Sequence, residues 1–543
     1  MLTRLRHLHV PQALRQAIAS YYENVQLRVR TPAGLSDAFQ STAGVKQGCP
    51  LSPTLFGLFI DHFEEFLANS DSLVGELYRD KPAHAHHRPR LLLYADDIVL
   101  IGRSPEELQC LLDCLAQFCA ATGMTVNREK TQVVIFRKGH QVTGRATFQY
   151  NGEDLQTVDE YRYLGFYFHA WLRPDQHGFP KLLASAQRAA NWLSGRCHAL
   201  GIRDLSAALR LFNMYVRPIL LYACHVWLPF LDSGENNAFR LECSPLEKVQ
   251  LSFMKSFLRL PQSTPTAPLL WETGVEPILP SALRIIFRYI FKTFYHWKCY
   301  RFSYPISSGI SFRDCDYRFC IFERSLLEFV PTSPFFRTSA DLHKDSWILK
   351  FSHLLEYFCK VKPSKCLETV SRLDFASTVY DIASTQFRSQ LTSSLTRNTG
   401  TVHQYFNNVR SESPGQVPYL WSSRSFVNRD LLLRLRLSAL KLDLQRQRWA
   451  GVPSAVRTSC PCCTCECVES ERHFLLECPL YKSLRFNRKF RHLFHRPEGG
   501  PAMDSELSDI LRTSDYDTLG HFVFVALQRR RDYLAKRQKP QEY

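Results

Sequence analysis

The sequence predicts an α+β protein made of an antiparallel sheet with packed helices, a mainly helical middle and a small metal-binding C-terminal module. A short apolar hairpin at residues 90–101, followed by a one-sided helix, predicts the first part. From about residue 180 to 425, apolar residues recur at the i, i+3 and i+4 spacing of helices. Five cysteines within residues 460–467, with His473 and Cys478 behind them, predict the last part.

The composition favours a folded chain with a polyanionic partner. The 543 residues are 45% hydrophobic, and the net charge is +17. Nucleic acid is the partner that we expect, although an acidic membrane surface also fits this charge. No stretch reaches the roughly 18 apolar residues of a membrane span, and the N-terminus lacks the apolar core of a secretory signal. We therefore expect no membrane segment, an intracellular (nuclear or cytoplasmic) chain and mostly reduced cysteines.

The hairpin reads RLLLYADDIVLI, two aliphatic runs joined by Ala95, Asp96 and Asp97. These three residues suit a tight turn between two strands. Adjacent carboxylates repel each other, and burial would raise that cost unless a cation is present. Magnesium is the natural cation because it prefers oxygen ligands. A surface turn with two solvated aspartates is the alternative.

The segments on either side of the hairpin predict helices. Ser104 can cap the following helix, Pro105 fits its first position, Glu107 completes a capping box and Gly123 ends it. This helix would cover one face of the sheet and leave the other for a substrate.

Before the hairpin, Gln47 and Gly48 lie in a glycine-containing loop that precedes a second helix. That helix starts at Ser52 and Pro53 and runs past Phe66 along one apolar face. Glycine lets a backbone approach a ligand closely, and a helix N-terminus attracts phosphate. An ordinary loop is the alternative.

Four segments occur in an order that identifies a family. They read GVKQGCPLSPTLFGLFID, LLLYADDIVLIG, GMTVNREKTQVVIF and YRYLGFYF, from residue 44 to residue 168. Together they resemble the palm of reverse transcriptases, and more narrowly that of non-LTR (LINE-type) retrotransposons. The resemblance implies an RNA-directed DNA polymerase that takes an RNA template, a DNA primer or target, and deoxynucleotides.

The resemblance also implies roles for individual residues. Asp96 and Asp97 would bind catalytic Mg²⁺, and Lys130 would lie near the leaving pyrophosphate. A solvated surface lysine is the alternative for Lys130. The residues implied at the template, nucleotide and primer terminus are Gln47, Gly48, Tyr94, Tyr163, Leu164 and Gly165.

One expected residue is missing from the pattern. The family's palm has a further metal-binding aspartate on a strand before the first helix, yet Glu23 and Asp37 are the only acidic residues before Gly44. Neither has the expected setting. We therefore expect an N-terminally truncated polymerase without fingers that is inactive or nearly so by itself. The alternatives are a non-catalytic nucleic-acid-binding remnant and a translated fossil.

These inferences divide the chain into four expected regions. They are a partial palm at 1–170, a thumb-like helical region at 171–260, a helical connector at 261–424 and a C-terminal module at 425–543. In the thumb-like region, Lys248, Lys255 and Arg259 are candidate phosphate contacts. A solvated helix surface is the alternative for each of them.

The C-terminal cysteines have the spacing of a small zinc site. Cys460-x2-Cys463-x9-His473-x4-Cys478 would place the last two ligands on one short helix and at its end. A similar arrangement occurs near the C-terminus of non-LTR polyproteins, which supports these four as Zn²⁺ ligands. The choice stays open, because Cys462-x2-Cys465 is another pair, Cys467 is close, and free thiols are an alternative.

The segment after these cysteines mixes basic and aromatic residues, YKSLRFNRKFRHLFHR. Its arginines are candidates for contacts with nucleic acid. Its phenylalanines, which are spaced by four, are better explained as a core-facing stripe.

Overall fold

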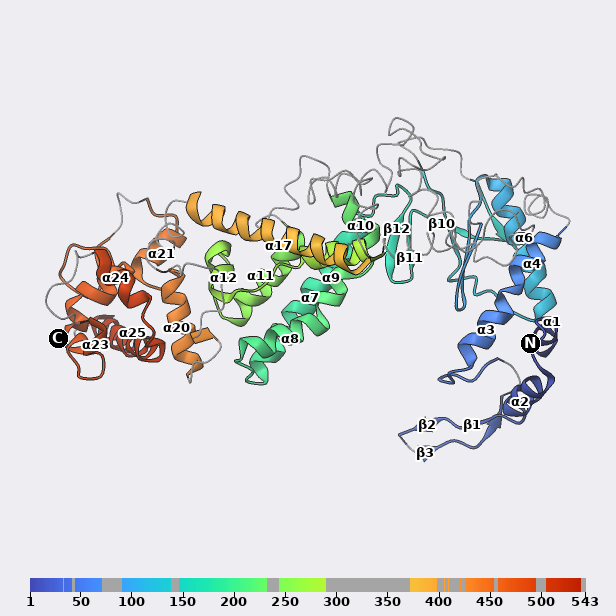
Figure 1. Cartoon of the computed structure of the whole chain (residues 1–543), viewed down its shortest axis with the longest axis horizontal. Coiled ribbons are helices and arrows are strands. Elements are labelled where there is room, and N and C mark those ends of the chain that lie inside the picture. Colours follow the sequence, from blue (N-terminus) through green and yellow to red (C-terminus); the bar gives the residue numbers. More distant parts are fainter. Residues whose placement is uncertain are drawn as a thin grey trace. The chain divides into compact units, whose positions relative to one another are not determined.

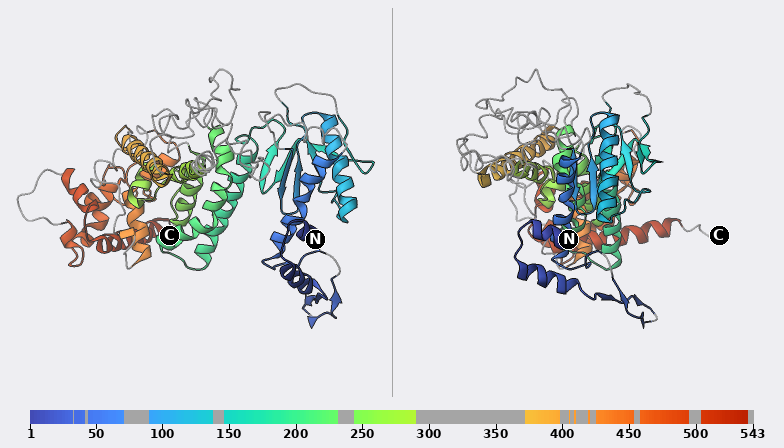
Figure 2. Two further views of the ribbon diagram at one scale, coloured as in Figure 1. Left: turned by 45° about the vertical axis from the view of Figure 1, so that its right-hand side comes forward. Right: turned by 90° about the vertical axis from the view of Figure 1, so that its right-hand side faces the viewer.

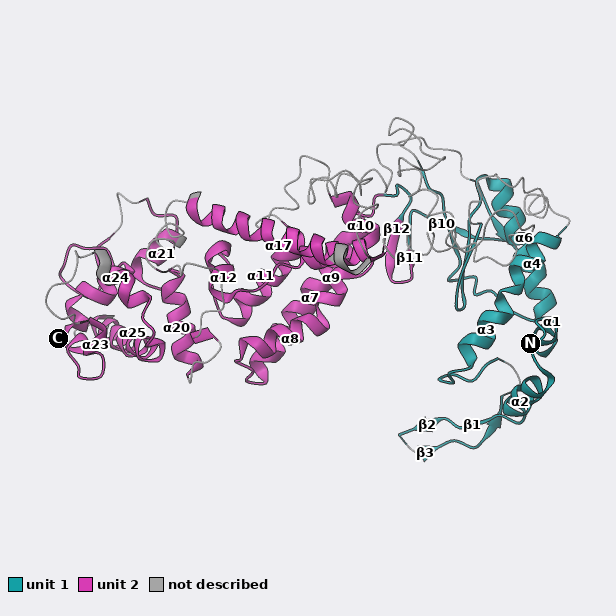
Figure 3. Ribbon diagram, viewed as in Figure 1, with its two compact units in different colours: residues 1–161, 169–172, 310–324 teal, residues 162–168, 173–309, 325–543 magenta. Residues whose placement is uncertain are grey.

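A computed structural model gives the fold of the chain. The residues that it describes are 1–32, 34–41, 44–70, 90–137, 146–231, 244–289, 372–397, 405, 409, 419–420, 425–453, 458–494 and 504–538. They form two compact units (Figure 3). One unit comprises residues 1–161 and 169–172, and the other comprises residues 162–168 and the described residues from 173 onward. Most of the expected connector at 261–424 lies outside the described residues.

The first unit combines helices with short paired strands (Figure 1). Its helices are α1 (Leu2–His7), α2 (Gln12–Tyr22), α3 (Ser52–Ile60), α4 (His62–Asn69) and α6 (Pro105–Thr122). Its strands are β1 (Gln26–Leu27), β2 (Arg30–Thr31), β3 (Gly34–Leu35), β4 (Phe39–Gln40), β5 (Leu91–Tyr94), β6 (Asp97–Leu100), β7 (Gln132–Val134), β8 (Gln149–Tyr150), β9 (Glu153–Asp154) and β10 (Gln156–Val158). The pairs β1–β4, β2–β3, β5–β6 and β8–β9 are antiparallel, whereas β7–β10 is parallel. This mixture of helices and small sheets confirms the predicted α+β class.

The hairpin of β5 and β6 has one face against the core of this unit. Leu91 and Leu93, with Ile98 and Leu100 opposite them, pack against the apolar side chains of α4 and α6. Inside that core the rings of Phe63 and Phe118 lie 4.7 Å apart. The views of Figure 2 show β5 and β6 beside α4 and α6. The helix therefore covers one side of the hairpin, as the sequence predicts.

The ends of α6 follow the predicted caps with one difference. Ser104 Oγ accepts a hydrogen bond from the amide of Glu107 (3.2 Å), and Gly123 ends the helix with φ +72°. The Glu107 carboxylate, however, binds the amide of Arg103 (2.9 Å) and Arg90 Nε (2.5 Å) instead of closing a capping box on Ser104. Arg90, just before β5, thereby anchors the hairpin to the start of α6.

The helix predicted from Ser52 past Phe66 is divided into α3 and α4 at Asp61. Ser52 does not cap α3. Its hydroxyl donates to the carbonyl of Lys46 (2.7 Å) and shares a hydrogen bond with Tyr22 (2.9 Å). The start of α3 therefore fixes the loop before it.

The second unit is mainly helical, with a hairpin at its start. That hairpin consists of β11 (Glu160–Tyr163) and β12 (Phe166–His169), of which residues 162–168 belong to this unit. The helices up to α17 are α7 (Gly178–Ala199), α8 (Leu205–Tyr215), α9 (Arg217–Leu221), α10 (Cys224–Trp227), η1 (Leu228–Leu231), α11 (Pro245–Phe257), α12 (Thr266–Thr273) and α17 (Arg372–Arg397). Those beyond are α20 (Phe426–Arg436), α21 (Asp443–Trp449), η6 (His473–Glu477), η7 (Pro479–Tyr481), α22 (Lys482–Arg485), α23 (Arg491–Phe494), α24 (Asp504–Leu511) and α25 (Tyr516–Gln538). Among the described helices, none combines the length and apolarity needed to cross a bilayer.

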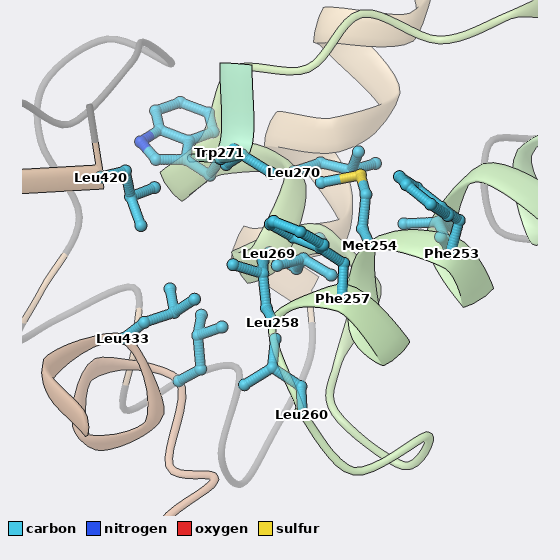
Figure 4. Packing of buried hydrophobic residues seen from close by; sticks show 14 of the residues in the cluster. Phe253, Met254, Phe257, Leu258, Leu260, Leu269, Leu270, Trp271, Leu420 and Leu433 are labelled. Atoms are coloured by element: carbon cyan, nitrogen blue, oxygen red, sulfur yellow. The ribbon is translucent and has the colours of Figure 1, made fainter. Parts of the chain in front are cut away.

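One continuous apolar core joins these helices, from Phe166 to Ala526. Figure 4 shows part of it, where side chains of α11 and α12 meet Leu420 and Leu433. The expected thumb-like region and C-terminal module therefore share a core within this unit.

A buried polar cluster crosses that core. Arg436 on α20 donates to both carboxylate oxygens of Glu272 on α12, at 2.9 and 3.1 Å. The hydroxyls of Tyr405 and Tyr419 donate to the same carboxylate at 2.7 and 2.8 Å. Burial, and next the Glu272 charge, raise the pKa of both tyrosines, so they stay protonated as donors. Because every partner is satisfied, this cluster fixes α12 against α20.

Candidate active site and metal site

The acidic bend is a two-residue turn between β5 and β6. Tyr94 pairs with Asp97, so Ala95 and Asp96 form the turn. Ala95 has φ +52°, a left-handed conformation that is unusual for alanine. Because directly paired residues share a sheet face, Asp97 lies with Tyr94, Leu92 and Val99 on the face opposite to the α6 core.

Both carboxylates are exposed to solvent. Among the described residues, Asp96 and Asp97 have no hydrogen-bond or ion-pair partner. Because the two carboxylates are exposed, they carry no desolvation cost for a cation to offset. A cation here would instead reduce the repulsion between their adjacent charges. Within the described part of the chain, no third His, Cys, Asp or Glu joins them in a group close enough to share a metal ion.

The loop that carries Gln47 and Gly48 is fixed by its neighbours. Lys46 Nζ lies 3.7 Å from the centre of the Tyr21 ring and donates to the Tyr21 carbonyl (2.6 Å). Gly48 has φ +79°, which only glycine adopts without strain. Gln47 itself is exposed. The lysine beside Gln47 is thus a structural residue, a role that its spacing in the sequence does not reveal.

Lys130 lies in the turn before β7. Its amide donates to Asn127 Oδ1 (3.2 Å), and its carbonyl accepts a hydrogen bond from Tyr161 Oη at 3.5 Å. The side chain is exposed. The turn is therefore held by its backbone, while the ammonium group is available to solvent.

Tyr163, Leu164 and Gly165 form the tip of the β11–β12 hairpin in the second unit. Leu164 and Gly165 have φ +47° and +83°, the pattern of a type I′ turn. Tyr222 donates a hydrogen bond to the carbonyl of Leu164, and its ring lies about 3.4 Å from where a Cβ on Gly165 would be. Tyr222 is a supporting residue that the sequence analysis missed.

The first unit therefore holds one part of the predicted site, with side chains open to solvent, and the second unit holds the hairpin tip. The residues in the first unit are Gln47, Gly48, Tyr94, Asp96, Asp97 and Lys130.

Comparisons with known proteins identify this region. A family model described as "Reverse transcriptase (RNA-dependent DNA polymerase)" matches residues 2–168. The N-terminal region is related to the reverse transcriptases of non-LTR retrotransposons. All four quoted motifs lie within the match, which confirms the resemblance inferred from them.

Three relatives agree with this relationship. The Pol polyprotein from the type-2 retrotransposable element R2DM of Drosophila melanogaster is 29% identical over 174 residues, which cover 31% of this chain and 16% of that protein. The RNA-directed DNA polymerase from the mobile element jockey of Drosophila funebris is 26% identical over 261 residues, 46% of this chain and 26% of that protein. The Pol polyprotein from the type-1 retrotransposable element R2 of Nasonia vitripennis is 24% identical over 180 residues, 32% of this chain and 17% of that protein. The chain thus spans about a quarter or less of the length of these relatives.

Beyond the reverse-transcriptase region, a second cluster lies near the C-terminus. One ligand atom each from Cys460, Cys463, His473 and Cys478 lies within 4.8 Å of the others. The π-helical turn η6 brings the last two together, because the amide of Cys478 donates to the carbonyl of His473 (2.7 Å). Three thiols and one imidazole at such distances are a donor set that suits zinc.

The orientation of His473 supports this arrangement. Its Nε2 lies 3.3 Å from Cys463 Sγ, while its Nδ1 lies 3.4 Å from Glu477 Oε2. A carboxylate behind a ligating histidine is the usual second partner of a zinc-bound imidazole. Glu477 follows His473 by four residues, so the spacing could have suggested this role.

The other cysteines have different surroundings. The Cys462 thiol points to Glu469 Oε1 (3.9 Å), which also binds Arg530 Nε (2.7 Å). Cys460, Cys462 and Glu469 make an alternative group, and Cys467 with His473 and Glu477 makes another. Both alternatives use a carboxylate, whereas the first set consists of the soft ligands that zinc selects.

Contacts among the thiols shift their ionisation in opposite directions. Hydrogen bonds from Cys462, and next from Cys478, lower the pKa of Cys460. The hydrogen bond to Cys460 in turn raises the pKa of Cys478. Neighbouring thiolates repel each other, and a divalent cation is what allows several of them to ionise together.

The last helix holds this segment in place. Arg530 on α25 binds both oxygens of the buried Glu469, at 2.7 and 2.6 Å. Arg537 Nη1 donates to the carbonyl of Pro461 (2.9 Å). These contacts join residues that are 61 and 76 positions apart, so no local pattern could have predicted them.

The basic segment after the cluster divides into buried and exposed residues. Arg485, an expected nucleic-acid contact, is buried and donates to the carbonyls of Leu475 (3.2 Å) and Cys478 (2.8 Å). Phe490 is buried as expected, whereas Phe486 is 56% exposed. The exposed cations that flank Phe486 in the sequence are Lys482, Arg488, Lys489 and Arg491.

Proposed function

We propose that the chain carries the nucleotidyl-transfer site of an RNA-directed DNA polymerase, with Asp96 and Asp97 as its metal-binding carboxylates. The observation that carries this proposal is the acidic turn, which leaves both side chains exposed on a hairpin whose other face is packed. Two adjacent carboxylates with unused oxygen atoms fit a hard cation such as Mg²⁺.

Each residue then has a defined task. Asp96 and Asp97 would hold Mg²⁺, which would supply positive charge for the transfer of a nucleotidyl group from a deoxynucleotide. Lys130 offers its exposed ammonium group to the leaving pyrophosphate, as a charge or as a proton donor. Gln47, Gly48 and Tyr94 bind template and nucleotide. Tyr163, Leu164 and Gly165 position the primer terminus.

We propose further that activity of the chain by itself is low. In the described residues no third carboxylate accompanies Asp96 and Asp97, and a reacting atom misplaced by about 1 Å already costs on the order of a hundredfold in rate.

Primer extension on an RNA template with a DNA primer and Mg²⁺ tests this function. Weak extension is expected, and Asp96→Ala or Asp97→Ala should lower it on the order of a hundredfold. Asp37→Ala, an exposed aspartate of the same unit, should leave it unchanged. Extension that survives Asp96→Ala would contradict the assignment, and vigorous Asp96-dependent synthesis would contradict low activity.

Metal binding at the bend can also be tested by a measurement that needs no turnover, which applies even if the chain has no detectable polymerase activity. Fe²⁺ can take the place of Mg²⁺, and with added hydrogen peroxide and ascorbate it generates hydroxyl radicals that cut nearby backbone. We expect cleavage within residues 90–101 that Asp96→Ala abolishes and Asp37→Ala preserves. Cleavage that is absent there, or equal in all three proteins, would count against metal binding at the bend.

We also propose that 171–260 acts as a thumb on the product duplex, and that Cys460, Cys463, His473 and Cys478 bind Zn²⁺ within the region 425–543. A second candidate function is nucleic-acid binding without catalysis. The exposed cations around Phe486 favour it, because they combine charge neutralisation with an aromatic face.

A further inference from the structure

A hollow of about 190 Å³ lies in the second unit, away from the cysteine cluster. We call it the arginine groove. It is lined by Arg203, Arg259 and Arg434 and by Phe426, Val427 and Leu431, and Asp430 also borders it. Arg203 follows α7, Arg259 follows α11, and the other residues belong to α20.

The groove has a net positive charge that contacts within the described residues do not neutralise. Among the described residues, the guanidinium groups of Arg203 and Arg259 have no hydrogen-bond or ion-pair partner. Arg434 Nε is buried without a partner, although its Nη2 donates to the carbonyl of Arg259 (2.9 Å). Asp430 is already paired with Arg429 at 2.6 Å. Asp430 also attracts Arg434, but three arginines against one aspartate leave the groove with a net positive charge, which would attract an anion.

The backbone at Arg259 is left-handed. The end of α11 is a Schellman motif, in which the amide of Leu260 donates to the carbonyl of Lys255 (2.8 Å) and that of Arg259 to Ser256 (3.1 Å). Arg259 has φ +54° at the position where glycine is preferred. Its neighbours Leu258 and Leu260 turn into the core near Leu433 (Figure 4).

The end of α7 offers a direct comparison within the same unit. There the equivalent amides of Ile202 and Gly201 donate to Cys197 (2.9 Å) and His198 (3.2 Å). Gly201, with φ +69°, occupies the left-handed position. Residues other than glycine also occupy this position, because Ser438 after α20 (φ +50°) and His9 after α1 (φ +55°) make the same pair of bonds. The left-handed backbone at Arg259 therefore only costs some stability, and the observation that counts is that its side chain lines the groove.

The apolar side of the groove is open as well. Phe426 is 43% exposed and Val427 is 56% exposed. The guanidinium carbon of Arg429 lies 5.1 Å from the centre of the Phe426 ring, which orients the aromatic ring at the groove. An anion that also carries a flat apolar group would use both sides of the groove.

We propose that the arginine groove binds a single nucleic-acid strand, with phosphates at Arg203 and Arg259 and an unstacked base on Phe426. The inference rests on the proposed function only in taking the polyanion to be a nucleic acid. Single strands combine backbone charge with free base faces, whereas a duplex offers its charge alone.

Binding of labelled oligonucleotides to the full chain tests the proposal. Fluorescence anisotropy would be measured with single-stranded RNA and DNA of one sequence, and with the duplex, over a series of salt concentrations. Arg259→Gly and Arg203→Ala should each lower affinity by about fivefold at low salt and reduce the salt slope by ~0.7. Phe426→Ala should lower affinity on the order of tenfold with the slope unchanged, and Phe426→Trp should restore it.

The controls separate this site from general basic charge. Arg210→Ala removes an exposed arginine on α8, outside the groove, and should change little. Arg259→Gly should raise the melting temperature while it weakens binding, because glycine suits the left-handed position. Fe²⁺ cleavage within residues 90–101 should be the same in Phe426→Ala as in the unaltered chain, so a failure at the acidic bend and a failure of this site are distinguishable.

Three results would overturn the proposal. One is an Arg259→Gly chain that melts higher yet binds the strand as tightly as the unaltered chain. Another is a duplex that binds with the same dependence on Phe426. The third is a polyglutamate peptide that displaces the strand through the same residues, which would make the groove a site for acidic protein segments.

Discussion

At the scale of single residues, Glu247 is a buried acid with a defined task. It lies on α11, and its Oε1 accepts hydrogen bonds from the amides of Ile278 (2.8 Å) and Leu279 (3.0 Å). These amides begin the helical residues 279–289, so the side chain serves as a cap supplied by a distant helix. Burial is the largest influence and raises the pKa of Glu247 to about 7, against the smaller effect of the two amides.

We predict that Glu247 makes the stability of the second unit depend on pH. Because its pKa is higher in the folded chain than in the unfolded chain, folding favours the protonated acid. The resulting stabilisation is complete below about pH 4 and is lost as the pH rises through about 7, a change of up to about 3 kcal/mol. Urea unfolding of the full chain at pH 5 and pH 8 measures the difference.

Glu247→Gln should reduce this difference, because an amide does not ionise in this range. Asp381→Asn, at an exposed position of α17, is the matched control and should leave the pH profile as it is. Profiles of the unaltered chain and Glu247→Gln that run parallel from pH 5 to pH 8 would rule out Glu247 as the source.

At the scale of elements, the sequence predicted those features whose determinants are local. The β5–β6 hairpin and the two ends of α6 follow from the acidic turn, Ser104 and Gly123. Local patterns could not predict the partner of Glu107, which is Arg90, nor the division at Asp61. In each case a contact or a chain direction set by distant residues decides the outcome.

The candidate site shows the same limit. Residue types and motif order predicted Asp96 and Asp97 as metal-binding carboxylates, which stays a prediction. They also predicted the set Cys460, Cys463, His473 and Cys478, whose possible ligand atoms lie close together in the structure. Supporting residues such as Tyr222 and Arg530 were missed because they act across the fold. Lys255, a candidate phosphate contact, is buried and donates to the carbonyl of Gln262 (2.9 Å), so it stabilises the chain instead.

For the β11–β12 hairpin we predict that Gly165→Ala destabilises the tip by about 1–2 kcal/mol. An alanine here would have to keep φ +83°, and its Cβ would meet the Tyr222 ring at about 3.4 Å. Gly165→Asn should cost less, because asparagine tolerates the left-handed region. Amide hydrogen exchange of residues 160–169 should accelerate most for alanine.

Gly195→Ala provides a control of opposite sign. Gly195 lies inside α7 with nothing within 4 Å of an added Cβ, so alanine there should stabilise the helix by about 1 kcal/mol. If both alanine variants changed stability in the same direction, the explanation from backbone conformation would be wrong.

At the scale of the whole molecule, the second unit links distant segments through buried polar contacts. Glu272 on α12 binds Arg436 on α20, and Glu469 beside the cysteine cluster binds Arg530 on α25. The helices α20 and α25 also approach closely at Gly520, where a Cβ would lie 2.7 Å from the carbonyl of Asn428. Breaking one buried pair by removing one partner leaves a charge unpaired, so a change at one segment should reach the others.

We therefore predict that zinc stabilises more than its own loop. The full chain should contain about one zinc per chain, and its removal by a chelator should lower the melting temperature of the second unit. Because Arg537 and Arg530 bind the cluster segment, hydrogen exchange should rise in α25 as well as in residues 458–481. Glu477→Gln should weaken zinc affinity about 10- to 100-fold through His473, whereas Cys467→Ser, at an exposed cysteine outside the four ligands, should retain the metal. If exchange rises in the cluster segment while α25 stays protected, the cysteine cluster folds independently of α25. A chain that contains no zinc would contradict the metal assignment altogether.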